Sequence, residues 1–232
     1  MIEPVLTLSP RLHMIASLIP SCTTAADIGA DHGRLSAALL LEGTCRHMLV
    51  CDISEASLAK ARKLFSSIGL SERATFCVGD GLAAYKAEQR PEAIVIAGVG
   101  GATACGILER GRERIGSAAL IISPMLGIED VRRYLGDNGY AIEAERIVRS
   151  ANRWALALRA RCLPDAVPYT RAQCLLGPLL SAESSEGFMR WLQWRIDVLE
   201  GAERSLLHAN DAARLAQVQA DLALLRARLH TG

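Results

Sequence analysis

Short apolar runs alternate with longer segments of helical periodicity through most of the chain. Five of the runs are expected to be strands, at about residues 24–29, 47–52, 74–78, 93–98 and 118–123. The segments between and after them have the apolar spacing of helices, expected at about residues 33–42, 54–69, 81–87, 101–114 and 127–137. An alternation of strands and helices predicts an α/β fold, in which helices cover both faces of a parallel sheet.

Two further patterns complete the expected sheet. Ser9 and Pro10 are typical of a helix start, so a short amphipathic helix is expected at about residues 8–18, before the first strand. Apolar and polar residues alternate over residues 141–148 and 153–158, and the segment between them is too short for a helix. We therefore expect an antiparallel hairpin that closes the parallel sheet.

The chain changes character at Pro164, which predicts a main domain of residues 1–163 and a C-terminal helical hairpin of residues 164–232. Two segments beyond this boundary, at about residues 186–207 and 211–229, carry leucine-rich seams with alternating spacings of three and four. Because the link between them is short, we expect a two-helix antiparallel coiled coil.

The first of these helices also contains Trp191 and Trp194, which the leucine-rich seam does not require for contact between the two helices. We expect them to dock the helical pair on the main domain. The alternative is that they stack on nucleic-acid bases.

The composition fits a folded protein of the cytoplasm. Half of the 232 residues are apolar and the net charge is +1, so neither a disordered chain nor a strongly basic nucleic-acid binder is indicated. The seven cysteines are scattered, so we expect no disulfide framework and no metal site. No apolar run approaches the ~20 residues that span a bilayer, and no signal peptide is visible, so no membrane partner is expected. A monomer is favoured.

The ends of the predicted strands carry glycines and acids. These segments are Asp27-Ile28-Gly29-Ala30-Asp31-His32, then Asp52, then Gly79-Asp80-Gly81-Leu82, and finally Gly98-Val99-Gly100-Gly101. Ligands of open parallel sheets bind beyond the carboxyl ends of the strands, so the four segments predict one nucleotide-type pocket. The G-x-G-x-x-G fingerprint of dinucleotide sites is absent, and the acids Asp27 and Asp31 would repel a pyrophosphate. They would attract a cationic or zwitterionic ligand, which favours S-adenosylmethionine over NAD as the cofactor.

In their order along the chain, these segments resemble the bacterial tRNA (adenine-N1)-methyltransferases of the TrmK type. The resemblance rests on the D-I-G-x-D-H and G-V-G-G elements, on Leu8-Ser9 with Arg11-Leu12, on Gly79-Asp80-Gly81-Leu82 and on the terminal helical pair. It covers essentially the whole chain. It implies the Rossmann-like class I methyltransferase sheet, S-adenosylmethionine as the cofactor, tRNA as the partner and tRNA (adenine(22)-N(1))-methyltransferase activity.

At two places the chain departs from the family pattern. Gly33-Arg34 stands where the family usually has an aromatic residue. Ser123-Pro124-Met125 stands where a Q-P-N-like element is usual, and this loop faces the target base in many methyltransferases. These departures concern the base preference and not the cofactor.

The strand-end chemistry assigns roles in cofactor binding. Asp52, followed by Ile53, is expected to accept hydrogen bonds from the ribose hydroxyls. Arg11 is expected to reach the methionine carboxylate, and a surface ion pair is its alternative role. The remaining cofactor contacts are expected from Asp27, Gly29, Asp31, Asp80, Gly81, Leu82, Gly98, Val99 and Gly100. Of these, Asp80 is expected to meet the adenine amine, with Gly81 and Leu82 beneath the ring.

The candidate catalytic residues are Asp31 and His32. Neutral adenine N1 already carries a lone pair, so its methylation requires alignment rather than deprotonation. Asp31 is expected to stabilise the positive charge that develops on the adenine, and His32 to contact the base. The alternatives are that Asp31 binds the cofactor amino group or caps a helix, and that His32 is structural.

Contacts with tRNA phosphates are expected from Arg34, Arg132 and Arg133 at the rim of the pocket. Arginine runs are also common on solvated faces, which is the alternative for all three. Two other functions compete with the main one. The first is a methyltransferase that acts on another RNA site or on a small molecule, and the second is a non-catalytic nucleoside-binding module.

Overall fold

A seven-stranded sheet forms the centre of the protein, and its strands lie in the order β3-β2-β1-β4-β5-β7-β6. The computed structural model describes residues 6–163, 165–183, 185–209 and 211–230. The strands are β1 (Cys22–Ile28), β2 (Cys45–Asp52), β3 (Ala74–Val78), β4 (Ala93–Ala97), β5 (Ala119–Ser123), β6 (Tyr140–Ser150) and β7 (Arg153–Cys162). The first five pair in parallel, whereas β7 is antiparallel to both β5 and β6. The predicted parallel sheet with its closing antiparallel hairpin is confirmed.

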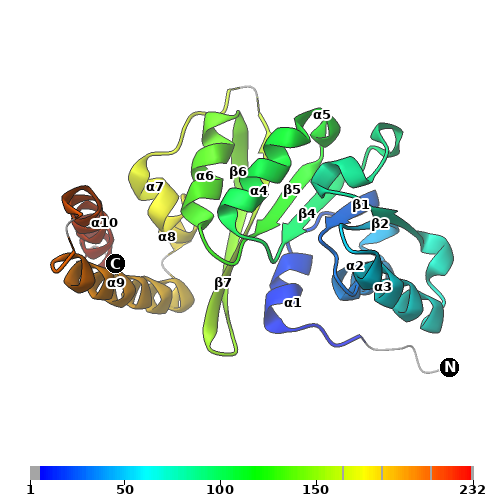
Figure 1. The fold of residues 1–232 in the computed structure, drawn as a ribbon, viewed down its shortest axis with the longest axis horizontal. Coiled ribbons are helices and arrows are strands. Elements are labelled where there is room, and N and C mark those ends of the chain that lie inside the picture. The colour runs from blue at the N-terminus through cyan, green and yellow to red at the C-terminus, as the bar shows by residue number, and fades with distance from the viewer. Residues whose placement is uncertain (1–5, 164, 184, 210, 231–232) are drawn as a thin grey trace.

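Helices cover both faces of this sheet, as Figure 1 shows. One core contains side chains of α1 (Pro10–Ala16), α2 (Arg34–Leu41) and α3 (Glu55–Ser67). The other contains side chains of α4 (Gly101–Arg110), α5 (Arg112–Ile115) and α6 (Ile128–Asp137). Successive strand residues alternate between the two cores, as Ala25 and Ala26 of β1 do. This burial on both faces explains why the strands read as continuous apolar runs in the sequence.

Two predicted helices differ from the observed structure because tertiary contacts override local periodicity. The helix expected at residues 81–87 is wrong: two short 3-10 turns, Gly81–Ala84 and Ala87–Gln89, flank Tyr85, which has an extended backbone and a buried side chain. The helix expected at residues 101–114 is divided at Gly111 into α4 and α5. A Cβ atom at Gly111 would lie 2.5 Å from the Leu82 side chain, so only glycine fits this close approach.

The C-terminal part contains α7 (Arg171–Leu176), α8 (Leu180–Glu183), α9 (Glu186–Leu206) and α10 (Ala212–His230). The predicted pair of long helices is confirmed, and α9 packs against α10 at one end of the molecule (Figure 1). Trp191 is buried in a third core that also contains Trp154 and Leu156 of β7, so it docks the helical pair as predicted. Trp194 remains 43% exposed. The short helices α7 and α8 were not expected.

The domain boundary expected at Pro164 lies outside the described residues and stays a prediction. All seven cysteines are free thiols. Within the described part of the chain, no helix has both the length and the apolar character that crossing a membrane requires.

Candidate functional site

A cavity of about 430 Å³ opens at the carboxyl ends of β1 and β4. Its wall brings together eight of the residues predicted for the site, namely Arg11, Asp27, Gly29, Asp31, His32, Arg34, Gly98 and Val99. They come from α1, from the turn between β1 and α2, and from the end of β4. The strand ends therefore form one pocket, at the edge of the sheet where parallel α/β folds bind their ligands.

The turn after β1 is held by hydrogen bonds to β2. The backbone N–H groups of Gly29 and Ala30 donate to the Cys51 carbonyl at 2.9 and 3.0 Å. Both Gly29 (φ 75°) and Asp31 (φ 50°) have left-handed backbones, which glycine and aspartate adopt more readily than most residues. The Asp52 carboxylate accepts hydrogen bonds from the backbone N–H groups of Asp31 (3.0 Å) and Ser54 (2.8 Å). Asp52 thus orders the turn, although it is not among the residues that line the cavity.

Asp27 is a carboxylate in the wall of the cavity that the fold keeps almost entirely out of water. It is 4% exposed, and its Oδ2 accepts a hydrogen bond of 2.7 Å from the Ser36 hydroxyl. Burial raises the pKa of Asp27 to about 6, the Ser36 hydrogen bond opposes the rise, and the negative charge of Asp52 adds to it. Ser36 was missed in the sequence, although it is an isolated polar residue among the apolar positions of α2.

The Arg11 guanidinium lies at the other side of the cavity, beside β4 and β5. Its Nη2 donates to the Ser123 carbonyl at 3.2 Å, and the position of a Cβ atom on Gly98 would lie 3.6 Å from the same nitrogen. Burial lowers the pKa of Arg11 from its usual value. The cavity therefore has a cation on one side and the carboxylates Asp27 and Asp31 on the other, an arrangement that fits a zwitterionic amino-acid group.

The two candidate catalytic side chains lie next to each other at the open side of the cavity. His32 Nδ1 is 3.4 Å from Asp31 Oδ2, and both side chains are substantially exposed, at 46% and 69%. Both side chains are therefore accessible from solvent.

The residues predicted to contact the adenine end of the cofactor have different environments. Asp80 forms an exposed ion pair with Arg110 at 3.1 Å, and Ile53 is 73% exposed. The prediction that Leu82 lies beneath the adenine ring is wrong. Its side chain is 1% exposed and belongs to the core, where it packs against Gly111. Gly81 has a left-handed backbone at φ 56° and begins the 3-10 turn that follows Asp80.

The glycines after β4 join the cavity to the loop that follows β5. Gly100 caps α4, and Gly101 donates its backbone N–H to the Leu126 carbonyl at 2.8 Å. A Cβ atom at Gly101 would lie 2.1 Å from the Gly127 carbonyl oxygen, which excludes any other residue without movement of the loop. The importance of Gly101 for packing was not foreseen.

The three arginines predicted to contact RNA have different environments. Arg34 is exposed and donates to the Thr7 carbonyl at 2.7 Å, and Arg133 forms an exposed ion pair with Asp130 at 2.6 Å. The prediction for Arg132 is wrong. Its side chain is 1% exposed and pairs at 2.8 Å with the equally buried Glu145, so it cannot contact RNA at the surface. The C-terminal segment contacts this pair, and the helical spacing of Arg132 with the buried Ile128, Val131 and Leu135 was the signal in the sequence that could have shown its burial.

Comparison with known families assigns the class of protein. A family model described as a methyltransferase domain matches residues 8–155, the segment that contains the cavity and all of its predicted residues. The strand order and the strand-end pocket agree with this match. The fold and the site therefore define a class I methyltransferase.

More specific similarity comes from curated and solved proteins. The tRNA (adenine(22)-N(1))-methyltransferase of Bacillus subtilis (strain 168) is 30% identical over 194 residues, which cover 81% of this chain and 81% of that protein. The chain belongs to this tRNA (adenine(22)-N(1))-methyltransferase family. The crystal structure of the B. subtilis m1A22 tRNA methyltransferase TrmK has a TM-score of 0.87 and 27% identity, with 97% of this chain and 100% of that chain covered. The Streptococcus pneumoniae protein Sp1610, in complex with S-adenosyl-L-methionine, has a TM-score of 0.87 and 26% identity with the same coverage.

Proposed function

We propose that this chain uses S-adenosylmethionine to methylate N1 of the adenine at position 22 of tRNA. The observation that carries the proposal is the 30% identity to the B. subtilis enzyme over 81% of both chains. The chemistry of the cavity supports it, because a cationic residue and carboxylates face the same space. S-adenosylmethionine has a zwitterionic methionine end and a sulfonium cation, and both match that charge arrangement.

The cofactor-binding roles divide between the cavity and the neighbouring ends of β2, β3 and β4. Arg11 binds the methionine carboxylate, and Asp27 and Asp31 face the ammonium group and the sulfonium cation. The backbones of Gly29, Gly98, Val99 and Gly100 allow close approach of the ligand. Asp52, beside Ile53, accepts hydrogen bonds from the ribose hydroxyls, while Asp80 and the Gly81 backbone hold the adenine end. When bound, the cofactor supplies an activated methyl group.

The residues of this chain then have little acid–base chemistry to perform. Adenine N1 carries its own lone pair, so the cavity accelerates the reaction mainly by alignment. Positive charge develops on the target adenine as N1 is methylated, and its N6 amino group becomes more acidic. Asp31 lies at the open side of the cavity, where its carboxylate stabilises that charge, and the adjacent His32 contacts the base.

A methyltransferase for a different nucleotide is the second candidate, because of the loop after β5. The Ser123 hydroxyl donates to the Leu156 carbonyl at 2.9 Å and is turned away from the cavity. Pro124 and Met125 have no amide group in their side chains. The loop therefore offers no side-chain hydrogen bond to read the Watson–Crick edge of the target base.

One experiment separates the two candidates. An unmodified tRNA transcript with adenine at position 22 is incubated with the protein and S-adenosylmethionine, and the product is mapped by nuclease digestion and mass spectrometry. We expect one methyl group, as N1-methyladenosine at position 22, and none on a transcript that carries guanine there. Methylation of both transcripts at another site would support the second candidate, and binding without transfer to either would remove both.

A further inference from the structure

The β6–β7 hairpin extends beyond the sheet at the edge that contains the cavity. Because β7 is antiparallel to β5 and to β6, β6 runs in the same direction as β5. Ile122 near the end of β5 is in register with Leu158, which is in register with Glu145 of β6. Residues 146 and 157 are therefore level with Ser123, the end of β5, and residues 147–150 and 153–156 continue past it by about 13 Å at ~3.3 Å per residue. Figure 1 shows this extension between α9 and α1.

This extension with the two residues at its base, residues 146–157, is called the hairpin arm below, and it adjoins the cavity through α1. The helix α1 carries Arg11 in the cavity wall and packs against β6. A shallow hollow between α1 and the arm is lined by Leu8, His13, Ile147 and Val148. A large substrate whose reactive group enters the cavity would therefore have the arm directly beside it.

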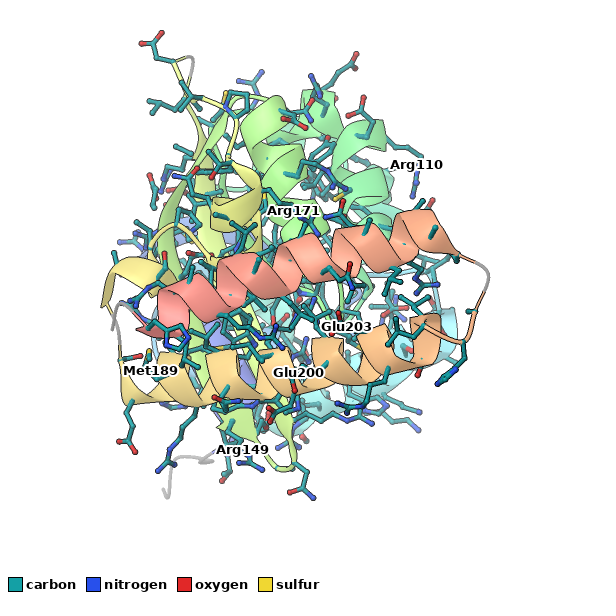
Figure 2. The ribbon with its side chains drawn as sticks, turned by 90° about the vertical axis from the view of Figure 1, so that its left-hand side faces the viewer. Arg110, Arg149, Arg171, Met189, Glu200 and Glu203 are labelled. Atoms are coloured by element: carbon teal, nitrogen blue, oxygen red, sulfur yellow. The ribbon has the colours of Figure 1, made fainter. Side chains whose placement is uncertain are left out.

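The hairpin arm carries positive charge only. It contains three arginines and no aspartate or glutamate. Arg149 and Arg153 are exposed, and neither forms an ion pair with an acid in the described part of the chain. The Arg149 guanidinium lies 5.9 Å from the centre of the Trp154 ring, its partner across the hairpin. In Figure 2, Arg149 lies at the lower edge of the view, below α9.

Several other exposed arginines of the protein are neutralised by acids. Examples are the ion pairs Arg62–Glu55, Arg112–Glu109 and Arg226–Glu200. With a net charge of only +1, the chain can attract a polyanion only where positive charge is concentrated locally. The hairpin arm is such a place, and it lies at the catalytic edge.

We propose that the hairpin arm binds the sugar-phosphate backbone of the substrate tRNA beside the methylated adenine, with Arg149 and Arg153 as the phosphate contacts. The guanidinium group suits this role because its parallel N–H groups match phosphate oxygens. The stacking of Arg149 on Trp154 holds its side chain on the arm while leaving the N–H groups available. This inference rests on the proposed function, which supplies the RNA substrate.

The test compares two double variants of equal charge. Arg149→Ala/Arg153→Ala removes two charges from the arm. Arg112→Ala/Arg161→Ala removes two from the opposite edge of the sheet, where Arg112 begins α5 and Arg161 donates to the Ser117 carbonyl just before β5. Binding of the unmodified tRNA transcript is measured at several salt concentrations, with S-adenosylmethionine affinity and the thermal unfolding midpoint as checks on the fold. We expect the arm variant to bind tRNA about tenfold more weakly than the wild-type protein. The magnitude of the slope of log K against log salt should decrease by about 1.5 to 2.

The control variant should keep the slope of the wild-type protein, and Arg149→Lys/Arg153→Lys should retain most of it because the charges remain. An unchanged slope in the arm variant, while the wild-type protein binds and methylates the transcript, would overturn the arm as an RNA contact. The proposal would also be overturned if the arm variant lost binding to vesicles that contain anionic phospholipid but kept its binding to tRNA. That result would mean that the arm contacts a membrane surface. If the wild-type protein neither binds nor methylates the transcript, the proposed function fails first, and that result is distinct from either outcome.

Discussion

At the scale of single residues, Asp27 shows how a site can retain an interaction that does not favour folding. Its carboxylate is nearly inaccessible to water, has one hydrogen-bond donor in Ser36 and lies close to the negative charge of Asp52. A carboxyl group with a raised pKa in the wall of a cavity is typical of a functional site. A positive charge in the cavity would favour its ionised form, so ligand binding would recover part of the cost of burying it.

This environment predicts a specific dependence of stability on pH. The folded protein holds the Asp27 proton more tightly than the unfolded chain, because burial raises the pKa from 3.8 to about 6. The free energy of unfolding contributed by this group is therefore highest below about pH 4 and falls as the pH rises to about 6. Asp27→Asn keeps an acceptor for Ser36 and should be more stable at pH 7, by up to ~3 kcal/mol. Urea unfolding at a series of pH values measures both effects.

The control for this prediction is Asp31→Asn, which changes an exposed carboxylate in the same turn. It should leave the pH dependence between about 4 and 6 as in the wild-type protein. Equal stability of Asp27→Asn and wild type at pH 7 would show that the buried carboxylate carries no penalty.

At the scale of elements, the junction between α4 and the loop after β5 is held by backbone packing. The N–H of Gly101 donates to Leu126, and the Cα of Gly101 lies against the Gly127 carbonyl. These contacts place the loop Pro124–Gly127 beside the glycine turn of the cavity. The position of the loop thus depends on the absence of a side chain at a single residue.

Two adjacent glycines allow this dependence to be tested. In Gly101→Ala the new Cβ would lie 2.1 Å from a backbone oxygen, so the loop or the helix must move, at a cost of ~1–3 kcal/mol. In Gly100→Ala the nearest atom to the new Cβ, Thr103 Oγ1, is 4.0 Å away. The cost should be limited to the poorer N-cap that alanine makes compared with glycine, and should lie well below the cost of Gly101→Ala. Chemical denaturation of the two variants without cofactor gives the comparison. Similar losses in both would mean that the loop accommodates a methyl group.

The elements also show what sequence patterns can and cannot predict. Strands and long helices were predictable because burial on both faces of a sheet and on one face of a helix produces regular apolar spacing. The segment around Tyr85 was not predictable, because burial of the Tyr85 side chain in the core determines its backbone conformation, and local preference does not. The split at Gly111 likewise depends on Leu82, a residue far away in sequence. The acids and glycines of the cavity were predictable because each ends a recognisable strand.

At the scale of the whole molecule, a buried ion pair joins the sheet domain to the C-terminal segment. Arg132 of α6 pairs with Glu145 of β6, and its Nη1 donates to the Cys174 carbonyl of α7 at 2.8 Å. The other Glu145 oxygen accepts from the backbone N–H groups of Leu179 and Leu180, at 2.9 and 3.3 Å. Arg132 shares the helical spacing of the buried Ile128, Val131 and Leu135 whereas Arg133 does not, so the phase of α6 could have distinguished them. The buried partners of Arg132 on β6 and α7 could not be read from that spacing.

These adjacent arginines give opposite expectations for stability. Arg132→Ala leaves the Glu145 carboxylate buried without its cation and the Cys174 carbonyl without a donor, so it should cost about 3–5 kcal/mol in the free energy of unfolding. Arg133→Ala removes a half-exposed ion pair with Asp130 and should change the free energy of unfolding by less than ~1 kcal/mol. Urea denaturation followed by far-ultraviolet circular dichroism measures both. Limited proteolysis should in addition release the C-terminal helices faster from Arg132→Ala than from Arg133→Ala, since the ion pair connects α7 and α8 to the sheet. Equal unfolding free energies for the two variants would show that this connection does not depend on the buried charges and that the apolar core around Trp191 holds the segment by itself.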